Sequence, residues 1–325
     1  MPYDRNFLLC LLALTFITVG CSGSHHKKAP GHDDHLRFIF ITTVVGEEFF
    51  IPVEKGMADA ARMMGVSCEF VGTEGVDIPA QAEMVRQAVR DGYDGIALNI
   101  IDDRGFDAVV QEAMDAGIPV VAFDVDDHAT PNARLSSVNQ QFYEAGKKLG
   151  AKAASSIPDG SEILMTMHAA GVSALNDRLR GVQDGLREAG KNGVTWKVVI
   201  TGNSGAESAE IIAHEFQANP NIKTILCTGQ ADTEGAGMVI KEHYPGQGYY
   251  AAGFDLSPEI LQNVMDGHIA FTIDQQPYIQ GFYPVIQLTL YKRYGIMPAS
   301  MDAGATPITQ DQAGSILELT KQHYR

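Results

Sequence analysis

Short, continuously apolar runs alternate with amphipathic stretches along most of the chain, beginning at Leu36. The apolar runs cover residues 36–44, 67–71, 94–99, 119–124, 162–167, 196–200, 223–228, 249–254 and 269–273. Most of them lack the alternation of apolar and polar residues that marks a strand with one face in water. They therefore predict strands that are covered on both faces, as in a parallel sheet.

The stretches between these runs carry helical periodicity. They cover residues 53–64, 79–91, 106–116, 141–156, 174–189, 206–218 and 257–266. Such a succession of strands and helices predicts a doubly wound α/β architecture with right-handed crossovers. The rhythm breaks at the polar segment 126–139 and starts again at Gly160, so we expect two similar lobes, in keeping with the length of 325 residues.

Polar and aromatic side chains cluster directly after the predicted strands. In open α/β sheets, ligands bind beyond the carboxyl ends of the strands, where the direction of the chain switches. The positions that follow a strand and carry binding chemistry are 47–50, 124–126, 230–232, Asp255 and 274–276. We expect these positions to surround a ligand site.

The N-terminal 35 residues are predicted to lie outside the lobes. Arg5 precedes an apolar run at 7–19, which fits the core of a signal peptide at 1–20 and is shorter than the ~20 residues that span a bilayer. The segment from Thr18 to Ser22 resembles the lipobox of bacterial lipoproteins, which implies lipidation of Cys21; a cleaved, soluble form is the alternative. Residues 21–35 are small and polar and predict a flexible tether, whose four histidines we interpret as a solvated spacer rather than a metal site.

Charge and cysteine content exclude several classes of partner. With 24 Lys and Arg against 40 Asp and Glu, the net charge of −16 repels nucleic acid, and it leaves a lipid anchor as the expected link to the membrane. The four cysteines form no CxxC pattern and no paired Cys/His spacing. We therefore expect no disulfide framework and no metal site.

Motifs for catalysis are absent from the sequence. There is no GxxxxGK[ST] loop, no GxGxxG after the first strand and no GxSxG elbow. His214 and Glu215 begin like HExxH, but Ala218 replaces the second histidine. We therefore predict that the chain is not an enzyme and needs no cofactor.

The residues after the first strand, Thr42–Phe50, end in a double aromatic, and five later segments continue a recognisable series. These are 119–124, ending in Asp124; 173–181, containing Arg178; 228–232, containing Gln230; 253–255, ending in Asp255; and 271–277, containing Gln275. In order and spacing, the series resembles the ribose-type periplasmic sugar-binding proteins. These proteins are the substrate receptors of bacterial carbohydrate uptake (ABC) transporters.

The resemblance implies a fold, a binding mode and a partner. The fold is that of the type I periplasmic binding proteins, with an N-terminal lobe at 36–137 plus 277–304 and a C-terminal lobe at 138–276 plus 305–325, joined by three hinge strands. The lobes would close over a sugar and present it to a membrane permease. The implied ligand-binding side chains are Phe49 and Phe50, which stack on the sugar ring; Asp124, Asp255, Gln230 and Gln275, which bind hydroxyl groups; and Arg178, which forms forked hydrogen bonds.

Departures from the ribose pattern bear on the ligand. Val125 stands where an arginine often follows the aspartate, and Glu47 and Glu48 precede the double aromatic. Together with Asp126 and the aspartates named above, these residues predict an acidic pocket. We therefore expect a neutral pentose, hexose or polyol rather than an acidic sugar, with an amine-bearing ligand as a minor alternative.

Other functions with the same two-lobed core remain open at this point. The chain could present a sugar or a furanose signal to a chemoreceptor or a histidine kinase instead of a permease. A repressor would need an N-terminal helix-turn-helix, in place of which this chain has a signal peptide and tether. We expect a monomer in the periplasm or at the cell envelope.

Overall fold

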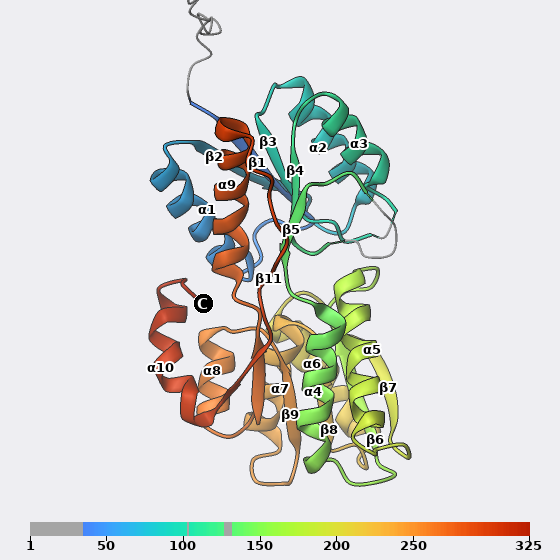
Figure 1. The fold of residues 1–325 in the computed structure, drawn as a ribbon. Coiled ribbons are helices and arrows are strands. Elements are labelled where there is room, and N and C mark those ends of the chain that lie inside the picture. Colours follow the sequence, from blue (N-terminus) through green and yellow to red (C-terminus); the bar gives the residue numbers. More distant parts are fainter. Residues whose placement is uncertain (1–34, 103, 127–131) are drawn as a thin grey trace, which may run out of the picture. The chain divides into compact units, whose positions relative to one another are not determined.

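The computed structural model describes residues 35–102, 104–126 and 132–325 (Figure 1). The predicted signal peptide, Cys21 and almost all of the tether lie outside these ranges. Within them, no helix combines the length and the apolar character that crossing a membrane requires.

The first sheet forms the N-terminal lobe with helices on both faces. In spatial order, its strands are β11 (Met301–Asp302), β5 (Ser136–Asn139), β4 (Val120–Asp124), β3 (Gly95–Leu98), β1 (Arg37–Thr42) and β2 (Ser67–Gly72). One face packs against α2 (Ile78–Arg90) and α3 (Asp107–Asp115). The other packs against α1 (Phe50–Met64) and α9 (Pro277–Tyr294).

The second sheet forms the C-terminal lobe. In spatial order, its strands are β12 (Thr306–Thr309), β10 (Phe271–Asp274), β9 (Tyr250–Phe254), β8 (Thr224–Cys227), β6 (Glu162–Met167) and β7 (Thr195–Ile200). On one face lie α4 (Phe142–Ala153), which runs into the short 3-10 helix η1 (Ala154–Ser156), and α5 (Ser173–Glu188). The other face carries α6 (Gly205–Ala218), α7 (Gln230–His243), α8 (Pro258–Met265) and α10 (Gln310–Lys321).

Each lobe has a hydrophobic core on either face of its sheet, and successive side chains of one strand pack alternately into the two cores. On β1, Phe38 and Phe40 belong to the core under α1 and α9, whereas Ile39 and Ile41 belong to the core under α2 and α3. All four are buried, because successive side chains of a strand point to opposite faces of the sheet. This double coverage is why the strand is apolar throughout.

The predicted α/β class with two parallel-sheet lobes is confirmed. Among the named strands of the described ranges, all pairings are parallel except β10 with β12, and each lobe follows the order second, first, third, fourth and fifth strand. Strand β5 was not predicted, since it lies at the end of the polar segment 126–139. Its sequence Ser-Ser-Val-Asn contains one apolar residue, although all four residues are buried. It keeps the chain in the first sheet up to Asn139, beyond the expected lobe end at 137.

Three crossings join the lobes within the described ranges. They lie between β5 and α4, between β10 and α9, and between β11 and β12. Gln276 Nε2 donates to the carbonyl oxygen of Ala303 at 2.6 Å, and the amide of Ala303 donates to the carbonyl oxygen of Asn139 at 2.9 Å. The crossings are therefore hydrogen-bonded to one another.

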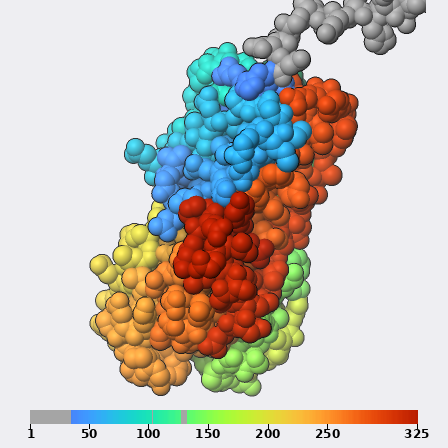
Figure 2. All heavy atoms as spheres, turned by 90° about the vertical axis from the view of Figure 1, so that its left-hand side faces the viewer, coloured from blue at the N-terminus to red at the C-terminus, as the bar shows by residue number. Residues whose placement is uncertain are grey.

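Residues that follow α10 also connect the lobes. The ring of Tyr324 lies 5.3 Å from that of Tyr278, centroid to centroid, and Lys55 Nζ lies 4.4 Å above its centre. Arg325 Nη2 pairs at 2.7 Å with Oδ2 of Asp274, at the end of β10. In Figure 2 the red C-terminal segment accordingly lies against both the blue part of the first lobe and the orange part of the second.

Candidate functional site

A cavity of about 370 Å³ lies between the carboxyl ends of the two sheets. Both lobes line it. The polar and aromatic lining residues are Thr43, Glu47, Glu48, Phe49, Phe50, Asn99, Asp124, Phe142, His168, Arg178, Asn203, Ser204, Gln230, Glu234, Asp255 and Gln275. Its volume falls in the range of small-molecule sites, which is about 300–1,000 Å³.

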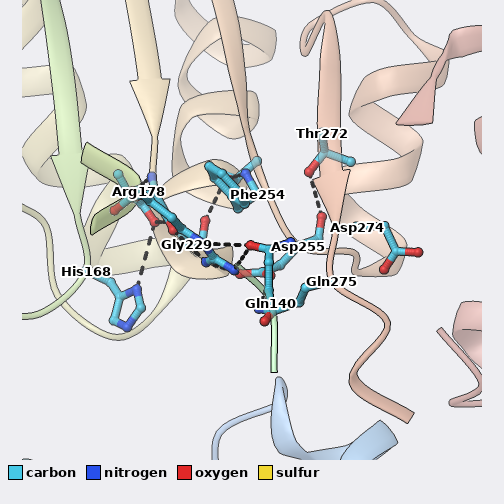
Figure 3. Close-up of polar contacts among 12 residues, drawn as sticks. Gln140, His168, Arg178, Gly229, Phe254, Asp255, Thr272, Asp274 and Gln275 are labelled. Carbon is cyan, nitrogen blue, oxygen red and sulfur yellow. Dashed lines mark hydrogen bonds and ion pairs between the residues drawn. The ribbon is translucent and has the colours of Figure 1, made fainter. Parts of the chain in front are cut away.

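Arg178 is the central cation of this cavity. It projects from α5 and is 2% exposed. Its guanidinium lies 4.1 Å from the ring centre of Phe254 and 5.0 Å from that of Phe142, so aromatic faces cover it. Nη1 donates to the carbonyl oxygen of Thr228 at 2.8 Å and lies 3.7 Å from Oδ2 of Asp255 (Figure 3).

The guanidinium still has donors for a ligand. It carries five N–H groups, of which one bonds Thr228 and two, on Nε and Nη2, bond the side-chain oxygen of Gln140. Two N–H groups remain, one on Nη1 and one on Nη2, and Nη1 lies beside Asp255. This fork is suited to vicinal oxygen atoms of a bound molecule.

Two aspartates supply acceptors at the strand ends. Asp124 accepts a hydrogen bond from Asn99 Nδ2 at 3.0 Å, and Asp255 accepts one from Gln275 Nε2 at 2.6 Å. Both carboxylates are less than a tenth exposed. Each retains lone pairs for further donors, because an ionised carboxylate accepts about four hydrogen bonds.

Burial dominates the electrostatics of the site. It raises the pKa of Asp124 to about 7, against the opposing effect of Arg178. It likewise raises the pKa of Asp255 and of Glu47 and lowers that of Arg178. Burial, with a smaller contribution from Arg178, lowers the pKa of His168 to about 4, so this histidine is neutral at pH 7.

The two phenylalanines have different environments. Phe50 is 4% exposed and belongs to the core under α1, where it packs near Phe70. Phe49 is half-buried and meets Phe50 edge-on, with ring centres 5.1 Å apart. Phe49 is thus the ring with a free surface toward the cavity, and Phe50 supports it from behind.

Most of the predicted ligand-binding residues line the cavity, and one does not. The nine that do are Glu47, Glu48, Phe49, Phe50, Asp124, Arg178, Gln230, Asp255 and Gln275. Asp126 is not among the lining residues, so its contact with the ligand stays a prediction. Its buried carboxylate forms an ion pair with Arg134, whose Nη2 lies 2.6 Å from Oδ2.

Six polar lining residues were not among the predicted site residues: Asn99, His168, Asn203, Glu234, Thr43 and Ser204. The first three occupy or follow the ends of β3, β6 and β7, so the strand-end rule that found Asp124 points to them as well. Glu234 lies on α7, a helix that the apolar pattern did not predict. The site is therefore more polar than expected.

Comparison with known proteins gives a consistent result. The family model described as periplasmic binding protein domain matches residues 38–292. The xylose/arabinose-binding protein of Sulfolobus acidocaldarius is 30% identical over 304 residues, which cover 88% of this chain and 74% of that protein. The D-allose-binding periplasmic protein of Escherichia coli is 22% identical over 253 residues, covering 74% and 79%.

A solved structure extends the comparison to the fold. A carbohydrate transporter from Acidothermus cellulolyticus, in complex with myo-inositol, superposes with a TM-score of 0.80 and 26% identity. The alignment covers 90% of this chain and 100% of that one. The two-lobed arrangement thus matches along nearly the whole length.

Proposed function

The chain belongs to the periplasmic binding protein family, and from this premise we propose that its cavity binds a neutral monosaccharide or polyol of the pentose or hexose class. The family resemblance inferred from the sequence motifs is confirmed by the match over residues 38–292. The relatives are binding proteins and not enzymes.

One observation carries the proposal: buried donors and acceptors with spare capacity converge on a cavity beside an aromatic face. A sugar ring has an apolar C–H face and a rim of hydroxyl groups, each of which needs a partner once buried. Phe49 offers the aromatic face. Arg178, Asp124 and Asp255 offer the fork and the acceptors, arranged around the same space.

The charge of the lining supports a neutral ligand. Among the lining residues in the described ranges, the acidic side chains are Glu47, Glu48, Asp124, Glu234 and Asp255, and Arg178 is the sole guanidinium or ammonium. Val125, 4% exposed, lies in the cavity wall. An arginine at this position would be a second cation and would favour an acidic group on the ligand. A carboxylate or phosphate on the ligand would meet repulsion.

The names of the relatives agree with this class of ligand. They are described as binding xylose or arabinose, allose, and galactofuranose, and the structural neighbour was solved with myo-inositol. None of these names identifies the sugar of this chain. They support a small, uncharged carbohydrate.

Delivery to a membrane permease completes the proposal. The family is extracytoplasmic, and transport is its typical role. Contacts from both lobes to one ligand favour the closed arrangement of the lobes, so binding shifts the population toward it. The closed surface of a monomer, tethered through a lipidated Cys21, would then dock on the permease.

The test is a thermal-shift screen of the purified protein against neutral aldopentoses, hexoses and polyols, with uronic acids and sugar phosphates as matched acidic compounds. We expect at least one neutral compound to raise the unfolding temperature, because a ligand that binds the folded state stabilises it. Stabilisation by the acidic compounds alone would contradict the proposal.

A further inference from the structure

Gln140 lies at the first crossing between the lobes and does not line the cavity, yet its amide bonds the ligand-binding arginine. Its Oε1 accepts hydrogen bonds from Nε and Nη2 of Arg178 at 3.1 and 2.8 Å (Figure 3). Its Nε2 donates to the carbonyl oxygen of Gly304 at 2.7 Å. One side chain therefore joins Arg178 to the third crossing.

The local structure leaves this amide little freedom. Gln140 is fully buried, and its own carbonyl oxygen accepts a hydrogen bond from Asn139 Nδ2 at 3.1 Å. Neighbouring Ala303 donates its amide to the carbonyl oxygen of Asn139. A rearrangement of the crossings that moved Gln140 relative to Gly304 would leave a buried polar group without its partner, which is unfavourable.

We propose that Gln140 is a positioning residue that couples Arg178 to the hinge. Its oxygen holds the guanidinium fork in the orientation that receives the ligand. Its nitrogen fixes the separation of the first and third crossings in that same arrangement. A ligand that engages Arg178 then favours the arrangement of the crossings in which Gln140 satisfies both partners.

Chemistry explains why a glutamine suits this position. A carboxylate could hold Arg178, but it would set an anionic oxygen against the carbonyl of Gly304. A methionine would fill a similar space without holding either partner. The amide alone offers an acceptor at one end and a donor at the other.

Two variants separate the two roles. Gln140→Glu keeps an acceptor for Arg178 and removes the donor to Gly304, whereas Gln140→Met removes both. The matched control is Gln287→Met: Gln287 also accepts from a side chain, Ser136 Oγ at 2.7 Å, and donates to a backbone carbonyl, that of Ala299 at 2.8 Å, within the first lobe.

The inference rests on the proposed function, so its first readouts use a neutral sugar that binds the unaltered protein. Calorimetry should show a dissociation constant about tenfold or more higher for Gln140→Met, since the charged guanidinium loses two hydrogen bonds. Gln140→Glu should recover most of that affinity. Small-angle X-ray scattering at saturating sugar should show weaker compaction than in the unaltered protein for both variants, and unchanged compaction for Gln287→Met.

Hydrogen exchange without a ligand tests the inference even if no neutral sugar binds and the proposed function fails. Arg178→Met removes the donors to Gln140, so the coupling predicts faster hydrogen exchange at residues 303–305 in this variant. Unchanged exchange there would overturn the inference. Where a sugar binds, equal losses of affinity in Gln140→Glu and Gln140→Met, or unaltered affinity in both, would overturn it as well.

Discussion

Asp124 and Asp255 occupy equivalent positions in the two lobes and share an unusual backbone conformation. Asp124 is the last residue of β4, and Asp255 directly follows β9, the fourth strand of the second sheet in the same spatial order. Their φ angles are +59° and +72°, in the left-handed region that residues other than glycine rarely adopt. Strained residues of this kind concentrate at functional sites, where the surrounding structure holds them.

The titration of Asp124 predicts a pH dependence of binding. Because burial raises its pKa to about 7, Asp124 is largely protonated at pH 6 and largely ionised at pH 8. The ionised form accepts stronger hydrogen bonds from sugar hydroxyl groups. Calorimetric affinity for a neutral sugar should therefore rise by up to about tenfold from pH 6 to pH 8.

The matched variant for this dependence is Asp124→Asn, which keeps the shape of the side chain and does not titrate. Its affinity should be lower at pH 8 and nearly flat with pH. An unchanged slope in this variant would assign the titration to another group.

The same raised pKa sets the sign of a stability change. A carboxyl group that binds its proton more tightly in the folded state contributes stability that is present below its ordinary pKa of 3.8 and is lost as pH rises through about 7. Asp124→Asn should therefore reduce the fall in the free energy of unfolding between pH 4 and pH 7. Urea unfolding curves of both proteins at several pH values measure this difference, and parallel curves would contradict it.

Close packing of α4 on α5 positions Arg178 and is sensitive to one added methyl group. A Cβ at Gly146 would lie 2.2 Å from the carbonyl oxygen of Arg178, and one at Gly181 would lie 2.1 Å from that of Tyr143. Gly181→Ala should push the helices apart, lower the free energy of unfolding by about 1–3 kcal/mol and weaken sugar binding.

The control for this packing is Gly193→Ala, where the added Cβ would meet its nearest neighbour at 3.6 Å, an ordinary contact. Thermal unfolding and calorimetry of both variants provide the comparison. Equal effects of the two substitutions would contradict the assigned role of the α4–α5 contact.

The neighbouring phenylalanines should respond differently to truncation. Phe49→Ala removes a half-buried ring from the cavity wall, so we expect affinity to fall several-fold to about tenfold with little change in stability. Phe50→Ala leaves a hole in the core, so we expect the free energy of unfolding to fall by about 3–5 kcal/mol. Chemical unfolding and calorimetry on each variant separate the two effects, and an exchange of these phenotypes would refute the assignment.

Arg325 supplies the charge partner of a buried hinge carboxylate. Burial raises the pKa of Asp274 and Arg325 lowers it, so Arg325→Met should raise this pKa further. We expect about 1–3 kcal/mol lower stability at pH 7, with the loss shrinking as pH falls and Asp274 becomes protonated. A loss of stability that stays constant between pH 4 and pH 7 would show that the ion pair is not its cause.

The strands that lead to Asp124, Asp255 and Gln275 were predictable because each is buried on both faces. All nine predicted apolar runs overlap a strand, β4 and β9 among them. Their carboxyl ends pointed to Asp124, Asp255 and Gln275, and order along the chain added Arg178; all four line the cavity. Local pattern and strand-end geometry were sufficient for these residues.

Other features depend on contacts between distant segments. Helix α9 was not predicted because it packs on both α1 and β4 and so lacks a continuous polar face. Asp126 follows a strand as Asp255 does, but it does not line the cavity and pairs with Arg134, eight residues later. The hydrogen bond from Gln140 to Gly304 joins residues 164 positions apart, so a local sequence pattern cannot predict it.

The most direct test of the account is a crystal structure of the protein with the neutral sugar that stabilises it most. We predict the sugar in the cavity between the lobes, with its apolar face on Phe49 and its hydroxyl groups bonded to Arg178, Asp124 and Asp255. A sugar bound outside this cavity, or one inside it that leaves Arg178 and both aspartates without ligand contacts, would contradict the central claim.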